Sequence, residues 1–130
     1  MISVLLPPFE GLPEAPGSYV LILKSSASFD IRVGALGTVS IKKGYYTYIG
    51  SARGGLKKRL KRYIKGPTKL HWHIDYLLRD ERFSVEEIVC VFSDAEEVLS
   101  DLFGKRFESI RGFGSSDTRS PSHLFLVYEV

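Results

Sequence analysis

The order of apolar runs along the chain is the feature that most constrains its fold. Short runs rich in β-branched and aromatic residues, punctuated by glycine and proline, come first and predict strands at residues 19–23, 31–33, 38–41 and 45–49. Helical patterns follow, with further strands between and after them: helices are expected at residues 56–65, 71–78 and 94–103, and strands at 85–92 and 124–130. Strands first and helices gathered later predict an α+β fold in which helices pack on a sheet.

The length and composition fit one folded domain. The chain has 130 residues, of which 44% are hydrophobic and 25% charged, so we expect a single domain over residues 1–130. No apolar run approaches the roughly 18 residues that a membrane span needs. The first nine residues lack the basic start of a signal peptide. Cys90 is the only cysteine, which excludes an internal disulfide and a multi-cysteine zinc site, and we expect a cytoplasmic protein without membrane contact.

Charge is unevenly distributed along the chain. Residues 1–30 carry a net charge of −2 and residues 75–130 a net charge of −6, whereas residues 31–74 hold eleven bases and no acid. A local charge of +11 in a chain of net charge +3 predicts an electropositive surface for a polyanion. The alternative for such a charge run is a lysine-rich helix face that contacts only water.

The predicted helix at residues 56–65 separates apolar from basic side chains. The stripe spaced for burial on the sheet consists of Leu56, Leu60, Tyr63 and Ile64. The side chains expected to point to water, where they could meet phosphates, are Lys58, Lys61, Arg62 and Lys65. Lys57 and Arg59 lie at the edges of the stripe, and the planar fork of Arg59 is the better phosphate clamp. The alternative for Arg59 is a stem that covers apolar surface.

Three motifs on these predicted elements carry a family resemblance. They are Gly17-Ser18-Tyr19, Tyr48-Ile49-Gly50 and Leu56-x-x-Arg59-x-x-x-Tyr63, and in this order they resemble the GIY-YIG nuclease domain. The resemblance implies a small, mainly antiparallel central sheet flanked by helices. The strands expected at residues 31–41 separate the two tyrosine motifs more widely than is common in that family.

Further segments resemble one subgroup, DUF123, which occurs alone or fused to DNA glycosylases of the endonuclease III type. These segments are Gly44-Tyr45-Tyr46, Gly50-Ser51-Ala52, residues 71–77, residues 112–117 and Ser122-His123-Leu124, and the resemblance spans about residues 16–128. Two departures reduce the expectation of turnover without touching the fold. Thr118 and Ser120 stand where the subgroup often has cysteines, and the chain contains no asparagine to match one found in some GIY-YIG nucleases.

The resemblance implies metal-dependent hydrolysis of phosphodiester bonds in DNA. Tyr19 and Tyr48 match the two motif tyrosines, which act as base and position the reactants. Arg59 matches the arginine that contacts the phosphate, and Tyr63 occupies a position where the family has His or Tyr. A tyrosine with an ordinary pKa of about 10 is a poor base at pH 7, so a metal or Arg59 would have to favour its phenolate. The alternative for Tyr19 and Tyr48 is simple packing in the sheet.

The metal-binding glutamate of the family aligns with Glu96, near the start of the last predicted helix. Glu96 would hold one Mg²⁺ or Mn²⁺ ion, because Mg²⁺ keeps several waters and needs few protein ligands. The ion would act as a Lewis acid on the phosphate and the leaving oxygen. The alternative is a capping box, Ser93-x-x-Glu96, in which Glu96 returns to the Ser93 amide.

Residues expected to contact nucleic acid surround this site. They are Arg53, Lys57, Lys58, Lys61, Arg62, Lys65, His71, His73, Ser122 and His123. The loop at residues 50–55 could bind a phosphate through backbone amides, although it lacks the spacing of a P-loop. His71-x-His73-x-Asp75 resembles a binuclear metal motif, but Tyr76 stands where that motif has His. Otherwise the two histidines are phosphate contacts or structural hydrogen-bonding groups, with Trp72 packed between them.

Three classes of function follow from these features. The first is a metal-dependent endonuclease acting on DNA, with DNA repair as its context. The second is a non-catalytic nucleic-acid-binding module of the same fold, with RNA not excluded as its partner. The third is a protein-interaction domain whose basic face docks an acidic partner. Because no helix presents a clear set of base-reading side chains, we expect contacts to the nucleic-acid backbone to dominate.

Overall fold

A six-stranded sheet forms the centre of the computed structural model, which describes residues 1–115 and 120–130. Its strands lie in the order β1-β6-β2-β5-β8-β7, and each neighbouring pair is antiparallel. The bounds are β1 (Ile2–Leu5), β2 (Gly17–Ser25), β5 (Gly44–Ala52), β6 (Phe83–Val91), β7 (Glu108–Ser109) and β8 (Leu124–Glu129). The predicted α+β fold with a mainly antiparallel central sheet is confirmed.

The central strand β2 has apolar side chains on both of its faces. Tyr19, Leu21 and Leu23 belong to a large buried cluster on one face, and Val20 belongs to a smaller cluster on the other. Successive side chains of a strand point to opposite faces, so a strand covered on both sides has a continuous apolar run. This double burial explains why residues 19–23 were recognisable as a strand from sequence.

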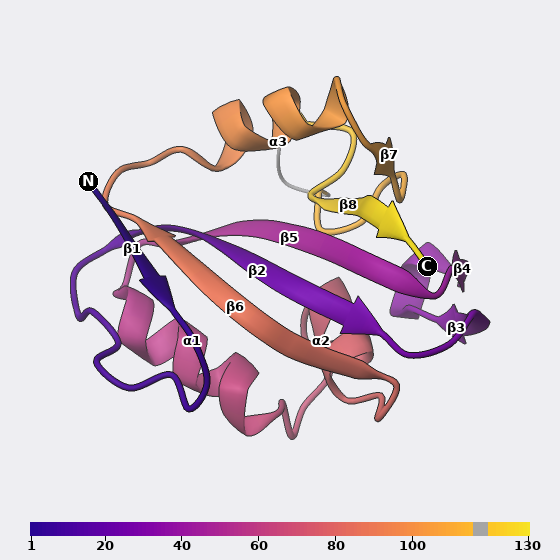
Figure 1. Cartoon of the computed structure of the whole chain (residues 1–130), viewed down its shortest axis with the longest axis horizontal. Coiled ribbons are helices and arrows are strands. Elements are labelled where there is room, and N and C mark those ends of the chain that lie inside the picture. Colours follow the sequence, from indigo (N-terminus) through magenta and orange to yellow (C-terminus); the bar gives the residue numbers. More distant parts are fainter. Residues whose placement is uncertain (116–119) are drawn as a thin grey trace.

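Three helices cover the sheet, two on one face and one on the other (Figure 1). Helices α1 (Leu56–Lys65) and α2 (His73–Leu78) cover the face with the large cluster, to which they contribute Leu56, Leu60, Tyr63, Ile74 and Leu77. Helix α3 (Glu96–Gly104) covers the other face, where Leu99 and Phe103 pack against the smaller cluster. The predicted bounds of α1 are confirmed, and Ile64 of the expected apolar stripe is only partly buried.

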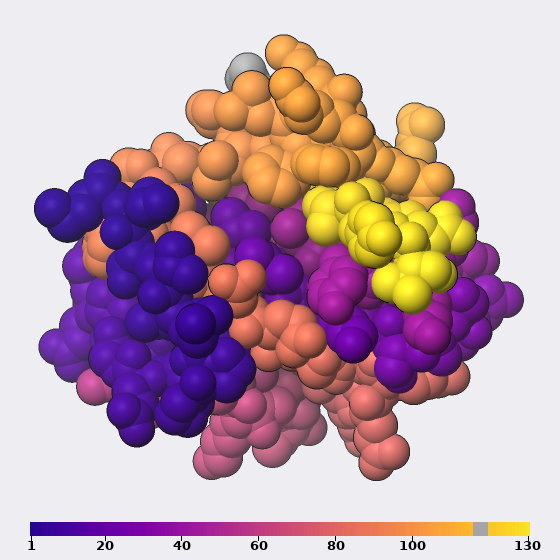
Figure 2. Space-filling model, in the orientation of Figure 1, coloured from indigo at the N-terminus to yellow at the C-terminus, as the bar shows by residue number. Residues whose placement is uncertain are grey.

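The face below α3 is only partly covered. Figure 2 views the molecule toward this face, and side chains of β2 and β6 remain visible between the N-terminal residues and α3. The fully or nearly buried members of the cluster here are Val20, Ile49 and Phe125. The larger core, and with it most of the apolar burial, therefore lies between the sheet and helices α1 and α2.

A small hairpin extends one end of the molecule. Strands β3 (Phe29–Arg32) and β4 (Thr38–Ile41) pair with each other and are joined by the short 3-10 helix η1 (Gly34–Leu36). Figure 1 shows the hairpin at the end of the long axis opposite the N-terminus. None of the helices in the two described ranges has the length and apolar character needed to cross a membrane.

Two features of the sheet differ from expectation. Strands β1 and β7 were not predicted, and β5 runs through Gly50 to Ala52 although Gly50 was expected to end it. Gly50 pairs with Tyr19 across the sheet, and a Cβ atom there would collide with the phenol of Tyr19. The glycine therefore makes room for a neighbouring ring instead of ending the strand.

Candidate functional site

One cleft gathers the side chains that the sequence motifs singled out. Tyr19, Tyr48, Arg59, Tyr63 and Glu96 all line a cleft of about 440 Å³. They come from β2, β5, α1 and α3, and they span 77 positions of the chain from Tyr19 to Glu96. The structure thus brings together residues that the sequence places far apart.

The pairing of β2 with β5 places the two motif tyrosines side by side. Tyr19 pairs with Gly50 and Leu21 pairs with Tyr48, so both phenols lie on the face that α1 covers. The centroid of the Tyr19 ring lies 6.4 Å from that of Tyr48 and 5.6 Å from that of Tyr63. The hydroxyl groups of Tyr19 and Tyr63 form a hydrogen bond of 2.7 Å.

Burial controls the ionisation of these phenols. Tyr19 is 1% exposed and Tyr48 is 6% exposed. Burial raises the pKa of both groups well above the ordinary value, and the charge of Arg59 lowers the pKa of both by a smaller amount. Burial also raises the pKa of Tyr63. At pH 7 the three side chains are therefore neutral phenols, each able to donate and to accept a hydrogen bond.

Arg59 is both partly buried and part of the cleft wall, so its place in the fold leaves both interpretations of its role open. Its side chain is partly buried against the large cluster, and its guanidinium lines the cleft. Nη1 donates a hydrogen bond of 3.2 Å to the Ser51 carbonyl oxygen, and Cζ lies 4.3 Å from the centroid of the Trp72 ring. Trp72, expected only to pack, also lines the cleft. The guanidinium is held from two sides, with its remaining donors in the cleft.

Glu96 is the first residue of α3. The N-cap residue of the helix is Ala95, so the capping box predicted at Ser93 is wrong. The Ser51 hydroxyl donates a hydrogen bond of 3.3 Å to Oε1 of Glu96, and Nε2 of His123 lies 4.0 Å from Oε2. The Glu96 side chain is 20% exposed, which leaves its carboxylate accessible from the cleft.

Ser18 fixes the segment that leads into α3. Its side chain is fully buried, and Oγ donates a hydrogen bond of 2.8 Å to the Ser93 carbonyl oxygen. The same Oγ accepts a hydrogen bond of 2.8 Å from the Ala95 amide. Strand β2 thereby positions both Tyr19 and the start of the helix that carries Glu96. Sequence reasoning missed Ser18 and Ser51, and their signal was a small polar residue inside or beside an apolar strand.

The cleft offers one carboxylate, which fits a divalent ion that is bound by few protein ligands. Among residues 1–115 and 120–130, no group of three or more His, Cys, Asp or Glu side chains is placed to hold a metal. Mg²⁺ commonly binds through one or two carboxylates and completes its shell with water and substrate phosphate. The Glu96 carboxylate satisfies this minimum, whereas a cage made of protein ligands alone is not formed by the described residues.

The residues of the binuclear metal motif serve other purposes. The Gly114 amide donates a hydrogen bond of 2.8 Å to Nδ1 of His73, whose pKa is lowered by burial. Asp75 is fully buried, and its Oδ2 accepts hydrogen bonds from the backbone amides of His71 and Trp72, each of 2.8 Å. His73 is thus a structural hydrogen-bonding group that holds Gly114 at the wall of the cleft.

Five of the predicted basic contacts come from Arg53 and from the lysines of α1. Arg53, Lys58, Lys61 and Lys65 are exposed, and Arg53 lines the cleft itself. Lys57 is partly buried and lies 3.6 Å from a carboxylate oxygen of Glu14. His71 is also exposed, so all six remain candidates for contact with a polyanion.

Three of the predicted contacts need correction. Arg62 does not point freely to water, because its Nη2 donates a hydrogen bond of 2.6 Å to the buried Asp75 carboxylate. Ser122 and His123 are 1% and 0% exposed, so neither can touch a nucleic acid at the surface. Ser122 Oγ instead donates to the Ile110 carbonyl oxygen at 2.5 Å, and His123 Nδ1 hydrogen-bonds to Ser100 Oγ. His123 is placed to orient Glu96.

The two positions where the subgroup often has cysteines differ in what can be described. Ser120 is buried, and its hydroxyl donates a hydrogen bond of 3.3 Å to the Asp101 carboxylate. Thr118 lies outside the described residues, as does Asp117 of the segment noted above.

Comparison with known proteins places the chain in a family. The family model described as "Domain of unknown function DUF123" matches residues 18–130, a range that includes every cleft residue named above. No curated protein and no solved structure matches the chain. Since the matched range covers most of the 130 residues, the chain belongs to the DUF123 family.

Proposed function

We propose that this protein is a divalent-metal-dependent endonuclease of the GIY-YIG type that hydrolyses phosphodiester bonds in DNA. The observation that carries the proposal is the meeting of three phenols, a guanidinium and a carboxylate in one cleft. The lysines of α1 that are exposed suit a polyanionic substrate, and one of them, Lys58, lines a cavity that shares Gly54 and Arg59 with this cleft. The motifs Gly17-Ser18-Tyr19 and Tyr48-Ile49-Gly50 connect this arrangement to the GIY-YIG resemblance.

Each group in the cleft suits one task of phosphodiester hydrolysis. Arg59 lines the cleft, where its planar guanidinium would bind two oxygens of the scissile phosphate and its charge would offset the negative charge that develops there. Glu96, with Ser51 and His123 beside it, would hold Mg²⁺ or Mn²⁺. When bound, such an ion supplies Lewis-acid stabilisation of the phosphate and the leaving oxygen.

The phenols are better suited to orienting a water molecule through hydrogen bonds than to acting as permanently ionised bases. Burial keeps Tyr19 and Tyr48 neutral at pH 7, because their pKa values lie well above 10. A neutral phenol can accept a hydrogen bond from water while it donates another, as Tyr19 and Tyr63 already do between themselves. Arg59 lowers the pKa of all three phenols, which favours the release of a phenol proton, so a phenol that takes a proton from water would pass its own proton on.

A nicking assay tests the proposal. Supercoiled plasmid and a panel of duplex, flapped and branched DNAs are incubated with Mg²⁺ or Mn²⁺, with EDTA as the metal-free reference. Wild type is expected to nick, and both Arg59→Ala and Tyr19→Phe are expected to reduce the rate by about 10²-fold or more. Arg79→Ala and Tyr128→Phe are matched controls, because both residues are exposed and lie outside the cleft. The proposal is abandoned if the wild type binds these DNAs but nicks none of them.

A non-catalytic nucleic-acid-binding module is the second candidate. The raised pKa values of Tyr19 and Tyr48 favour it, since a buried phenol is a weak base. Both candidates predict binding that weakens with salt, so binding alone does not separate them. Salt-sensitive binding of DNA or RNA by a protein that cuts neither, with any divalent ion, would support the second candidate.

A further inference from the structure

Trp72 stands where the cleft joins a second cavity. This neighbouring cavity has a volume of about 430 Å³ and shares Gly54, Arg59 and Trp72 with the cleft. Trp72 is partly buried against the large cluster, and the remainder of its ring forms part of both walls. The part of the indole ring that its neighbours leave uncovered is therefore accessible next to the residues that suit a phosphate.

The indole ring is fixed in position from several sides. The guanidinium carbons of Arg59 and Arg62 lie 4.3 and 5.0 Å from the ring centroid, within the range of cation–π attraction. The buried Asp75 carboxylate accepts a hydrogen bond of 2.8 Å from the Trp72 amide and one of 2.6 Å from the Arg62 guanidinium. Buried hydrogen bonds to one carboxylate thus hold the backbone of Trp72 and one of its two cationic neighbours.

A second aromatic ring flanks the cleft on its other side. Phe92 is 36% exposed and lines a third cavity of about 400 Å³, which shares Ser51 and Arg53 with the cleft. The cleft and its two neighbouring cavities, which share lining residues with it, thus together present two aromatic rings and the side chains of Arg53 and Arg59. Surfaces of this composition bind single strands, with bases stacked on the rings and phosphates at the cations.

Stacking on Trp72 sets a condition on the ligand. An indole ring can stack only on a base with a free face, and both faces of a base inside a duplex are covered by neighbouring pairs. The ring lies 4.3 Å from the Arg59 guanidinium, so the base that meets it belongs to a nucleotide whose own or adjacent phosphate is at Arg59. A continuous duplex cannot supply such a base without unpairing it.

We propose that the cleft binds an unpaired nucleotide, with its base stacked on Trp72 and its phosphate at Arg59. The substrate class is accordingly a single strand, or the single-stranded part of a flap, junction or loop. This inference rests on the proposed function in that the ligand is a nucleic acid, but it requires no cleavage.

Tryptophan fluorescence reports directly on this contact, because Trp72 is the only tryptophan in the chain. The protein is titrated in EDTA with a short oligothymidylate, with an abasic strand of the same length, and with a blunt duplex. The oligothymidylate is expected to quench the emission and to bind about tenfold more tightly than the abasic strand, as the stacking of one base provides. The blunt duplex is expected to leave the emission unchanged.

Substitutions at position 72 distinguish stacking of a base on Trp72 from a role of Trp72 in positioning Arg59. Because Trp72→Leu and Trp72→Phe contain no tryptophan, the binding of every variant is measured by the fluorescence anisotropy of dye-labelled strands. Trp72→Leu is expected to lose about tenfold in affinity for the oligothymidylate and little for the abasic strand. Trp72→Phe retains a ring and is expected to keep most of the affinity, and Tyr128→Leu is the control for an exposed aromatic residue outside the cleft. Equal losses for both strands in Trp72→Leu would mean that the ring only positions Arg59, and would overturn the proposal.

The nicking and quenching experiments together distinguish a failure of this inference from a failure of the proposed function. Nicking of blunt duplex with no quenching by any strand leaves the endonuclease standing and overturns the stacking contact. Quenching by the oligothymidylate in a protein that nicks nothing supports the stacking contact and removes the endonuclease. The absence of binding to all three ligands at low salt overturns the inference as well.

Discussion

Gly50 faces the Tyr19 ring across the β2–β5 pair, and the contact is too close for any side chain at position 50. A Cβ atom there would meet both the hydroxyl oxygen and ring carbons of Tyr19. Gly114 lies on the opposite side of the cleft with φ of 68°, and a Cβ there would lie 3.0 Å from the Tyr48 ring. Glycines therefore surround the two motif phenols and determine where their hydroxyl groups lie.

The Gly50→Ala substitution is expected to lower the free energy of unfolding by about 1–3 kcal/mol, the usual cost of forcing a methyl group into a packed site. The added atom also displaces the Tyr19 ring, which is buried and forms part of the cleft wall. Gly54→Ala is the matched control, because a Cβ at position 54 meets nothing within 4 Å, and its effect should stay within about 0.5 kcal/mol. Chemical denaturation measures both, and equal losses would refute the packing explanation.

His73 introduces a pH dependence of stability. Burial lowers the pKa of His73, and Nδ1 of its ring accepts a hydrogen bond from the Gly114 amide. The folded chain therefore favours the neutral form of the ring. The unfolded chain takes up this proton at a higher pH than the folded chain does. The free energy of unfolding is therefore expected to decrease as the pH falls below about 6.5, and to have its full His73 contribution above that value.

Denaturation with urea at several pH values between about 5 and 8 tests this dependence. His73→Gln is expected to flatten the profile of the free energy of unfolding, because it removes the titrating group but keeps a hydrogen-bond acceptor. His71→Gln is the control, since His71 is exposed and its ring has no such acceptor role. A His73→Gln profile that overlays the wild type would contradict the prediction.

The helices were more predictable than the outer strands. Helix α1 has glycine at both ends and an apolar stripe of its own, so its bounds follow from local sequence. Strand β1 has four residues, and Ile2 and Val4 in it are more than half exposed, so no apolar pattern marks it. It exists because it pairs with residues 88–91 of β6, a partner that sequence alone does not identify. The same holds for the two-residue β7.

The candidate site was predictable only in part for a similar reason. Family motifs identified Tyr19, Tyr48 and Arg59, and the alignment placed Glu96 beside them. The hydrogen bonds of Ser18 to the segment before α3 join residues 75 and 77 positions apart in sequence. No local pattern indicates contacts of that separation. The placement of Trp72 over Arg59 likewise depends on how two helices pack, and a helical pattern does not specify that.

A buried ion pair connects α1 with α2. Arg62 donates a hydrogen bond to the fully buried Asp75 carboxylate. The same carboxylate accepts hydrogen bonds from the backbone amides of His71 and Trp72 at the start of α2. Asp75→Ala leaves the amides of His71 and Trp72 without this acceptor and Arg62 with the Lys69 carbonyl oxygen alone, and we expect the free energy of unfolding to fall by about 3–5 kcal/mol. Chemical denaturation measures the loss.

Asp80→Ala is the matched control for this prediction. Asp80 also pairs with an arginine, at 2.8 Å, but the Arg82 side chain is 45% exposed. Surface pairs contribute little to stability, so we expect a much smaller loss than at Asp75. If the two substitutions destabilise the protein equally, the connection between α1 and α2 is not a principal support of the fold.

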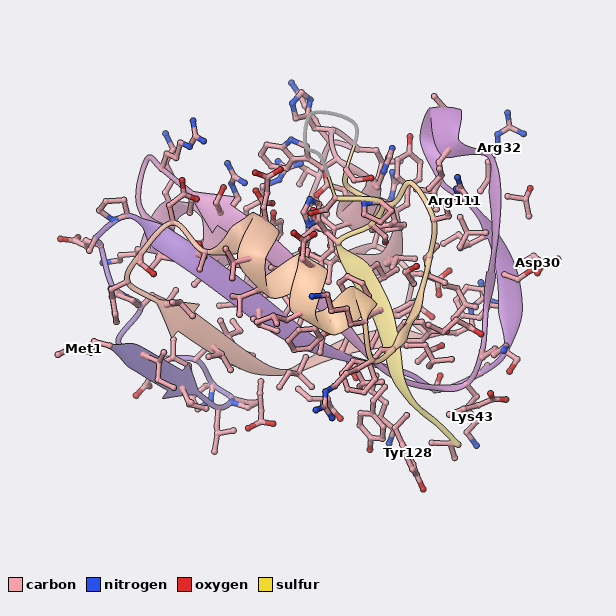
Figure 3. All side chains as sticks on the ribbon, turned by 90° about the horizontal axis from the view of Figure 1, so that it is seen from above. Met1, Asp30, Arg32, Lys43, Arg111 and Tyr128 are labelled. Carbon is pink, nitrogen blue, oxygen red and sulfur yellow. The ribbon has the colours of Figure 1, made fainter. Side chains whose placement is uncertain are left out.

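The basic middle third of the sequence divides between two ends of the molecule. Arg32 and Lys43 lie with Tyr128 at the end opposite Met1 (Figure 3), whereas α1 lies below β1 at the other end (Figure 1). Lys42 forms ion pairs there with Glu108 and Glu129, at 3.4 and 3.9 Å. The charge of +11 in the sequence is therefore not one surface, and of its bases Arg53 and Arg59 line the cleft.

The salt dependence of binding should reflect this division. Each exposed lysine of α1 that meets a phosphate contributes about 0.7–0.9 to the slope of log affinity against log salt concentration. We expect Lys58→Gln, Lys61→Gln and Lys65→Gln each to reduce that slope, measured by fluorescence anisotropy with labelled DNA. Lys43→Gln removes the same charge from the same stretch of sequence and should leave the slope unchanged. A reduction by Lys43→Gln equal to the others would place the nucleic acid elsewhere.

The short β1 at the outside of the sheet has a consequence for handling the protein. It covers the backbone of residues 88–91, and the chain then turns away at Pro7 and Pro8, so the outermost edge is only four residues long. Loss of the first five residues would uncover residues 88–91 as well, so that the whole of the nine-residue β6 would form the edge of the sheet. A long, apolar, uncovered edge recruits strands from other molecules. Proteolytic removal of the N-terminal residues is therefore expected to make the protein self-associate and precipitate.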